Sequence, residues 1–219
     1  MNKYRLRLSK TGTAIYISHL DLMHTLQRAF SRAGLKLKYS EGFNPHPQLS
    51  SAMPLSVGTS SKCEIIDFTL TEEIDMKTFP PLMNAVLPQG IEILEVYVPE
   101  TKVSSIKWLE VEGKLEYDSG DLNDICSELS EFYSKTSVTM LKKSKRGEAE
   151  TDIRPLIRDI NFRARNDAII VSAFVSANEP VLNPYNIVEA VRQNRPELNP
   201  DFAAFSRIET YDEKMEIFR

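Results

Sequence analysis

Alternating hydrophobic and polar positions open the chain. Over residues 3 to 9, Tyr4, Leu6 and Leu8 fall on one side of an extended segment, and Lys3, Arg5 and Arg7 fall on the other. Side chains of a strand point alternately to its two faces, so this period of two predicts a strand with one core face and one basic face.

The next segment has the period of a helix. Ser18, followed three residues later by Asp21, resembles a capping box, and Gly34 supplies a stop signal, so we predict a helix that runs to about Ala33. Its apolar stripe consists of Leu22, Leu26, Ala29, Phe30 and Ala33. The opposite face carries His24, Arg28 and Arg32, spaced by four residues, which makes the helix amphipathic with a basic exterior.

The rest of the first half alternates strands with one more helix. We predict strands at 36–39, 61–71 and 90–98, and a helix over 75–86 whose start is delayed by Pro80 and Pro81. Residues 40–47, which contain two prolines and a glycine, form an irregular loop. The resulting βαββαβ order is typical of a ferredoxin-like lobe spanning residues 1–104.

A similar order recurs in the second half, after a polar linker at 99–105. The pattern predicts strands at 106–117, 138–143, 150–156 and 168–175. Asp121 can cap a helix that runs through Tyr133, and Asn183 with Pro184 can start another that runs through Gln193. We therefore expect an α+β protein with two ferredoxin-like lobes in tandem, the second spanning residues 105–219.

Composition narrows the class of protein. The chain has 219 residues, 42% hydrophobic and 26% charged, which is ordinary for globular domains. The longest apolar stretch, 168–175, is far too short to cross a bilayer, and the N-terminus lacks the apolar core of a signal peptide. Cys63 and Cys126 show no metal-binding spacing. We expect a cytoplasmic protein with free thiols and no contact with membranes.

Charge is distributed unevenly along the chain. The net charge is −4, yet residues 1–50 contain eight Lys or Arg against Asp21 and Glu41. Cations on the predicted strand face (Arg5, Arg7) and on the helix face (Arg28, Arg32) could meet the phosphates of RNA, although they could form two separate patches or a plain solvated surface.

All three histidines, His19, His24 and His46, lie within this basic region. His19 and His46 could divide general-base and general-acid duties in RNA cleavage, because the pKa of histidine lies near neutrality. The alternative is that His19 is a hydrogen-bonded structural residue and that His24 is solvated. His19 and His24 point to different helix faces, so we predict no metal site.

The sequence lacks the motifs of several common nucleotide-binding and hydrolytic sites. The sequence has no GxxxxGK[ST], GxGxxG, GxSxG or HExxH motif, so we expect no nucleotide or dinucleotide cofactor and no standard hydrolase site. The basic run at 142–147 has the composition of a hairpin tip that could touch phosphates or simply be a solvated turn.

Four segments carry a resemblance to a known family. They are Leu6–Gly12, Ile17–Met23 (ISHLDLM), Tyr39–Pro47 (YSEGFNPHP) and Asp152–Ile157 (DIRPLI). Together they resemble a bacterial family of uncharacterised radical-SAM-linked proteins, in which such domains occur behind a radical SAM enzyme or as separate chains. The chain has no CxxxCxxC to hold a catalytic cluster.

The resemblance implies an accessory role. We expect a non-catalytic module that recognises a substrate for a radical SAM enzyme in trans, in a process related to RNA, and that needs no cofactor. Two alternatives remain open: a metal-independent endoribonuclease using His19 and His46, and a scaffold that binds only proteins. The candidate binding residues are Arg5, Arg7, Ser18, His19, Asp21, Arg28, Arg32, Phe43, Asn44, His46 and Arg154.

Overall fold

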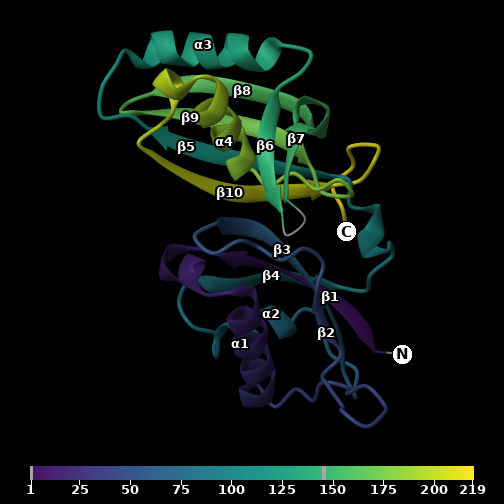
Figure 1. The fold of residues 1–219 in the computed structure, drawn as a ribbon. Helices are drawn as coiled ribbons and strands as arrows, with labels where there is room; N and C mark the ends of the chain where they lie inside the picture. The colour runs from purple at the N-terminus through teal and green to yellow at the C-terminus, as the bar shows by residue number, and fades with distance from the viewer. Residues whose placement is uncertain (1, 145–146) are drawn as a thin grey trace. The chain divides into compact units, whose positions relative to one another are not determined.

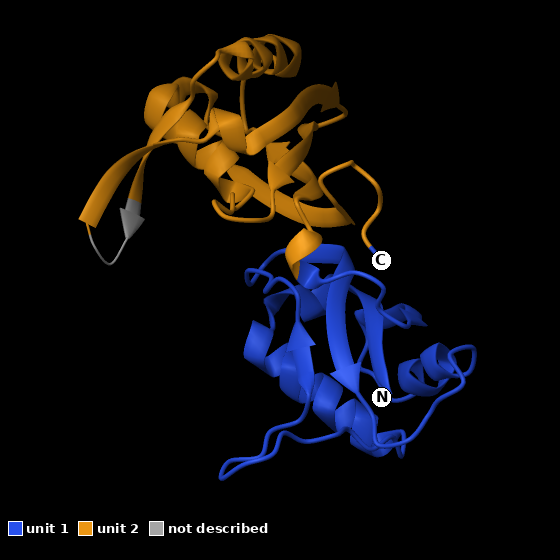
Figure 2. Ribbon diagram, turned by 90° about the vertical axis from the view of Figure 1, so that its right-hand side faces the viewer, with its two compact units in different colours: residues 1–103, 219 blue, residues 104–218 orange. Residues whose placement is uncertain are grey.

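The chain forms two compact units, which Figure 2 shows in separate colours. The structure is a computed structural model and describes residues 2–144 and 147–219. The first unit comprises Met1–Val103 with Arg219, and the second comprises Ser104–Phe218. The lobes predicted from sequence meet at 104/105. Each unit is described by itself below.

The first unit is an antiparallel sheet with two helices. Its strands are β1 (Lys3–Lys10), β2 (Leu49–Ser51), β3 (Ser60–Thr69) and β4 (Ile91–Tyr97), and its helices are α1 (His19–Arg32) and α2 (Phe79–Asn84). Strand β1 pairs with β4 on one side and β3 on the other, and β2 pairs with the far edge of β3 (Figure 1). The order is therefore β4-β1-β3-β2.

The hydrophobic core of this unit lies on one face of the sheet. Tyr4, Leu6 and Leu8 of β1 pack into it as the alternation predicts, and residues of both helices join them. From α1 and α2 the buried members are Leu22, Met23, Leu26, Ala29, Phe30, Phe79 and Met83. Because side chains of both helices share a core with the same face of β1, α1 and α2 cover that face together.

Helix α1 begins and ends where the sequence predicts. The backbone N–H of Asp21 donates to Ser18 Oγ at 3.1 Å, and the Ser18 hydroxyl donates to the Asp21 carboxylate at 2.7 Å. At the other end Gly34 takes φ +73°, a conformation that glycine adopts without strain, while the N–H of Leu35 donates to the carbonyl of Phe30 at 2.9 Å. Both ends therefore satisfy backbone groups that a bare helix leaves unpaired.

Buried Lys10 fixes the segment that leads into α1. Its ammonium donates to the carbonyls of Ile15 and Ile17 at 3.2 and 2.9 Å, and the residue is only 1% exposed. Burial lowers the pKa of Lys10, and the charge of Glu64 opposes that shift. Lys10 thus holds the short 3-10 turn η1 (Gly12–Tyr16) directly before the Ser18 cap.

Two predicted elements of the first unit are shorter than expected. The helix predicted at 75–86 is α2, with six residues, because Pro80 and Pro81 are confined to its first turn and Asp75 instead closes a turn by accepting from the N–H of Lys77. The strand predicted at 36–39 is reduced to two isolated bridges, Leu37 with Leu70 and Tyr39 with Pro47.

The second unit has the same kind of architecture with an added hairpin. Its strands are β5 (Trp108–Glu116), β6 (Thr139–Ser144), β7 (Gly147–Asp152), β8 (Ile157–Arg165), β9 (Ala168–Ser176) and β10 (Phe202–Tyr211), and its helices are α3 (Leu122–Ser134) and α4 (Tyr185–Asn194). The sheet order is β10-β5-β9-β8, with each neighbouring pair antiparallel. Strands β6 and β7 pair only with each other among the described residues. The remaining 3-10 turns are η2 (Val103–Ser105), η3 (Arg154–Leu156) and η4 (Pro196–Leu198).

Sequence and structure agree on β5, α3, β6, β9 and α4, and they differ on β7, β8 and β10. Asp121 caps α3 through bonds from the N–H groups of Asn123 and Asp124. The strand predicted at 150–156 ends at Asp152 and gives way to η3. Strands β8 and β10 were not predicted, since β8 exposes most of its side chains and shows too few apolar positions for a period-two signal.

The α+β class is confirmed, as a mixed α/β structure with antiparallel sheets. The two units share one strand order when their strands are compared in chain order and the β6–β7 hairpin is set aside. The finer description as tandem ferredoxin-like lobes stays a prediction. No helix in the described parts of the chain is long and apolar enough to cross a membrane.

The Ser18 cap yields a first test. Replacing Ser18 by Ala removes the acceptor for the Asp21 N–H and is expected to lower the free energy of unfolding by about 1 kcal/mol. Urea titrations followed by circular dichroism measure the change. Ser31→Ala, at an exposed position late in the same helix, is the matched control and should change stability far less. Equal losses in the two variants would contradict the capping role.

Candidate recognition site

The Asn-Pro-His-Pro loop, residues 40–47, is held by its two legs on the end of β3. The N–H of Lys38 donates to the carbonyl of Thr69 at 2.8 Å, and the N–H of Thr69 donates to the carbonyl of Gln48 at 3.0 Å. The legs also bond to each other, from Gln48 N–H to the Lys38 carbonyl at 2.8 Å. One residue of the sheet edge, Thr69, therefore anchors both sides of the loop.

Ser40 and His46 close the loop. The N–H of Ser40 donates to the carbonyl of His46 at 2.8 Å, and the N–H of His46 donates back to Ser40 Oγ at 3.1 Å. A third contact joins Ser40 Oγ to His46 Nδ1 at 3.0 Å. The imidazole ring is consequently oriented by its own loop although His46 is exposed.

An aromatic side chain stands at the tip of this closed loop. Phe43 has a relative exposed area of 112%, the highest among the exposed large hydrophobic residues described. Gly42 before it takes φ +123°, which any other residue would adopt only with strain, and this turn directs the chain through the tip. The phenyl ring is therefore open to solvent and to any ligand that approaches the loop.

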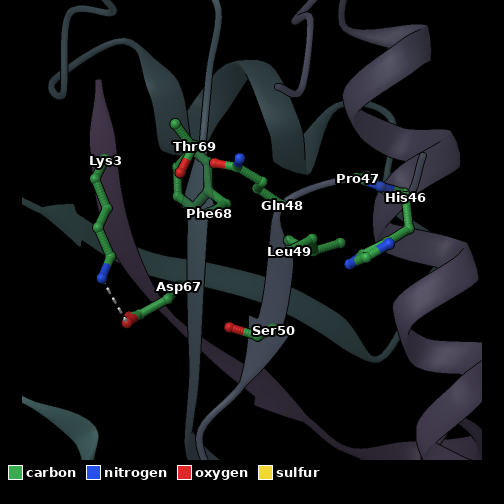
Figure 3. Close-up of a pocket in the computed structure, with 9 residues that line it drawn as sticks. All are labelled: Lys3, His46, Pro47, Gln48, Leu49, Ser50, Asp67, Phe68 and Thr69. Carbon is green, nitrogen blue, oxygen red and sulfur yellow. Dashed lines mark ion pairs between the residues drawn. The ribbon is translucent and has the colours of Figure 1, made fainter. Parts of the chain in front are cut away.

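A shallow hollow of about 320 Å³ lies beside the loop (Figure 3). It is lined by Lys3, His46, Pro47, Gln48, Leu49, Ser50, Asp67, Phe68 and Thr69. In Figure 3 Lys3 and Asp67 stand at one side and His46 at the other, with Ser50 and Leu49 between them. The lining combines an ammonium, an imidazole, an amide and hydroxyl groups, so it can bind polar and anionic ligands.

The charged groups on the Lys3 side of the hollow differ in how closely they are paired. Asp67 accepts two bonds from the Arg5 guanidinium, at 2.6 and 3.0 Å, whereas Lys3 Nζ lies 3.9 Å from the same carboxylate. The Lys3 side chain is 51% exposed. Arg5 therefore neutralises Asp67 more closely, and the Lys3 ammonium remains accessible to a ligand.

The expectation of an open cationic sheet face does not hold at Arg5. Arg5 is only 1% exposed because its guanidinium is committed to Asp67. Arg7 pairs with Glu95 at 3.5 Å and is mostly covered. On the helix face, Arg32 donates to the carbonyl of Val86 at 2.8 Å, while Arg28 is exposed. Of these four arginines, Arg28 and Arg32 are exposed, and Arg32 makes the bond to Val86.

The structure does not bring His19 and His46 together. His19 is the first residue of α1, and the segment before it departs from the C-terminal end of β1. His46 lines the hollow with Lys3, at the N-terminal end of β1. The fourteen residues of α1 alone span roughly 20 Å. His24 is exposed on α1. Among the described residues, no three His, Cys, Asp or Glu side chains cluster in a way that could hold a metal ion.

Ser18, Asp21 and Arg154 act in local structure. Ser18 and Asp21 form the cap of α1. In the second unit, Arg154 donates to the carbonyls of Tyr133 and Ile157 at 3.0 and 2.7 Å and so ties the end of α3 to the start of β8. Asp152 accepts from the N–H groups of Val138 and Arg154. In the basic run at 142–147, Lys145 and Arg146 lie outside the described residues.

Sequence reasoning found the loop but missed its surroundings. Phe43, Asn44 and His46 were candidates, and all three lie in the exposed turn. Lys3 was noted only as one of the strand cations, and Gln48 and Thr69 were not selected. Gln48 could have been selected from the sequence, because it directly follows the Pro-His-Pro segment. The pairing of both loop legs with Thr69, at a distance of twenty or more residues in sequence, carried no local signal.

The fold and this site define a two-unit α/β protein with a structured, exposed loop. The chain belongs to the family described as "Uncharacterized protein conserved in bacteria (DUF2344)", whose model matches residues 3–184. None of the curated proteins matches it. This family membership establishes ancestry and leaves activity open.

Two solved structures are similar to the chain. A chain of a Cbf5-Nop10-Gar1 complex is 10% identical with a TM-score of 0.50; the match covers 96% of this chain and 50% of that one, so this chain spans about half of that protein's length. An unknown protein from Galdieria sulphuraria is 10% identical over 94% of this chain and 98% of that one, with a TM-score of 0.27. At such identity the first likeness shows the fold alone.

The Asp21 carboxylate gives a prediction that depends on pH. The hydrogen bond from the Ser18 side chain is the main cause that holds the pKa of Asp21 below its usual value in the folded state. A depressed folded-state pKa stabilises the fold above the unfolded-state pKa, and this contribution disappears as the pH falls through the folded-state pKa. The urea midpoint of Asp21→Ala should therefore be lower than that of the wild type at neutral pH and converge with it in acid. A constant difference across that range would contradict the assignment.

Proposed function

We propose that this protein is a non-catalytic recognition module that binds single-stranded RNA through the Asn-Pro-His-Pro loop and works with a radical SAM enzyme in trans. The observation that carries the proposal is the fully exposed ring of Phe43, held by an internally bonded turn beside the Lys3–His46 hollow. We also propose that the two units are ferredoxin-like lobes. Their shared strand order supports this.

The chemistry of this arrangement suits unpaired nucleotides. Bases that are not in a duplex stack on aromatic side chains, and each such contact contributes about 1–3 kcal/mol with little dependence on sequence. Lys3 and Arg28 supply accessible cations for phosphates, and His46, Asn44 and Gln48 supply hydrogen-bonding groups. The sheet face is less suited to this role, because Arg5 and Arg7 are engaged in ion pairs.

The proposal assigns no reaction to the chain. Cleavage of RNA by a histidine pair needs both rings at one phosphodiester, within hydrogen-bond reach of the transferred protons. His19 and His46 lie at opposite ends of α1, and nothing in the geometry favours the endoribonuclease alternative.

The partner rests on the motif resemblance. ISHLDLM and YSEGFNPHP resemble domains linked to radical SAM enzymes, and the chain has two cysteines in all, too few for the three that ligate such a cluster. Ser18, Asp21 and Arg154 have structural roles, as described above, and Phe43 at the tip of the loop is the most exposed large hydrophobic residue of these motifs.

Removal of the tip ring tests RNA binding. Phe43→Ala is expected to weaken binding of a fluorescent single-stranded decauridylate about tenfold, because one stacking contact is lost. Fluorescence anisotropy measures the dissociation constant. The matched control is Phe202→Ala, which removes a ring that is 57% exposed in the other unit and should leave affinity unchanged.

A salt titration of the wild type separates RNA recognition from a scaffold that binds only proteins. Phosphate contacts give an affinity that falls with salt, with a slope in the double-logarithmic plot of about −0.7 per contact on a single strand. Binding that is undetectable, or equally affected by Phe43→Ala and Phe202→Ala, would count against the RNA role.

The partner prediction has its own measurement. Tagged wild-type protein, purified from the bacterium that encodes it, should carry a protein with a CxxxCxxC segment that mass spectrometry identifies, and the purified pair should associate again on mixing. Phe43→Ala and Phe202→Ala serve to ask whether the loop is needed for this association. Repeated purifications without any such protein would remove the basis for a radical SAM partner.

A further inference from the structure

The hydrogen bonds of Ser40 decide what His46 offers to a ligand. Ser40 Oγ accepts from the N–H of His46 at 3.1 Å, so its hydroxyl hydrogen can donate to Nδ1, which is 3.0 Å away. This places the ring hydrogen of neutral histidine on Nε2, because only one ring nitrogen carries it. The competing tautomer would have Nδ1–H donate to the carbonyl of Asn44, at a longer distance of 3.4 Å.

The first arrangement satisfies more groups. With Nδ1 as acceptor, the His46 N–H, the Ser40 hydroxyl and Nδ1 are all paired within the loop. With Nδ1–H, which would donate to Ser40 Oγ or to the carbonyl of Asn44, the hydroxyl hydrogen of Ser40 is left to bond to water. The ring that lines the hollow therefore presents Nε2–H, a hydrogen-bond donor, even when it is uncharged.

The opposite side of the hollow presents a second donor. Lys3 lies on β1 and Leu49 on β2, with β3 between them, so their backbones are two strand spacings, about 10 Å, apart. Because Lys3 and His46 stand on opposite sides of the hollow (Figure 3), an extended ligand suits both groups. An extended strand with a phosphate at every nucleotide can place one phosphate at Lys3 and another acceptor oxygen at His46.

We infer that the hollow in Figure 3 is a binding site for the backbone of single-stranded RNA, in which His46 Nε2–H and the Lys3 ammonium each donate to a phosphate oxygen and Ser40 is the positioning residue that fixes the tautomer of His46. This inference rests on the proposed function. It adds that the site binds the phosphates of the RNA backbone, next to the base that stacks on Phe43. Asp67 does not repel the backbone strongly, since Arg5 neutralises it through two bonds.

Two kinds of measurement test the inference. Long-range proton–nitrogen NMR spectra of the full chain, recorded with the His46 ring uncharged, report the tautomer directly. We expect Nε2–H in the wild type and in Ser40→Thr, which keeps the hydroxyl, and a mixture of tautomers in Ser40→Ala. A wild-type spectrum with Nδ1–H would overturn the inference whatever the affinity for RNA.

Binding of decauridylate and of an abasic phosphodiester decamer supplies the second measurement. His46→Gln keeps an N–H near the place of Nε2 and should bind within threefold of the wild type, whereas His46→Ala should lose about tenfold on both ligands. Lys3→Gln should lower the salt slope by about 0.7. His46→Gln as weak as His46→Ala would refute the donor role.

Measurements with these ligands also distinguish failure of the inference from failure of the proposed function. If the hollow is wrong but the loop binds RNA, decauridylate still binds the wild type and Phe43→Ala still weakens it, while the His46 and Lys3 variants match the wild type. If the wild type binds neither decamer, the proposed function fails together with the inference. Displacement of decauridylate by millimolar inorganic phosphate, but not by chloride of equal ionic strength, would instead indicate a site for free phosphate and overturn the assignment to RNA.

Discussion

The reciprocal bonding between Ser40 and His46 is the constraint on which the site depends. Residues 41–45 contain a glycine and a proline and make no regular structure, so without that closure the tip would sample many conformations. The backbone and side-chain bonds between Ser40 and His46, together with the attachment of both legs to Thr69, restrict it to one turn. The entropy of ordering a recognition loop is thereby spent in folding instead of in binding, which favours affinity for a partner.

Internal use of cations explains why charge along the sequence is a poor guide to the surface. The excess of Lys and Arg in the first fifty residues indicates a basic exterior, yet Arg5 is committed to Asp67, Lys10 to two carbonyls of η1, and Arg32 to the end of α2. Arg5 and Lys10 satisfy partly buried acceptors that would otherwise be left unpaired, whereas the bond of Arg32 lies at the surface. The exposed cations of this region are Lys3, Arg28, Arg32, Lys36 and Lys38, and their positions follow from the tertiary fold.

Local signals predicted local structure well and tertiary pairing poorly. Four predicted features depend only on residues close together in the sequence, and the structure confirms them. They are the alternation of β1, the Ser18 cap, the Gly34 stop and the Asp121 cap. Strand β8 exposes most of its side chains and β2 has three residues, so neither carries enough apolar periodicity to be found alone. The candidate site shows the same division, since Phe43 and His46 stood out as residue types while Lys3 and Thr69 join them only through strand pairing.

The two units place their added segments at the same point of the chain order. In the first unit, the segment that carries the Asn-Pro-His-Pro loop lies between the first helix and the second strand of the sheet; in the second unit, the β6–β7 hairpin lies between α3 and β8, the corresponding elements. A connection there joins two elements of the packed layers, so it can lengthen without disturbing the core. The hairpin is secured differently, by Gln193 of α4, whose amide bonds to both the N–H and the carbonyl of Leu141. At this position of the shared strand order the first unit therefore carries the exposed aromatic turn, whereas the described part of the second unit carries the β6–β7 hairpin.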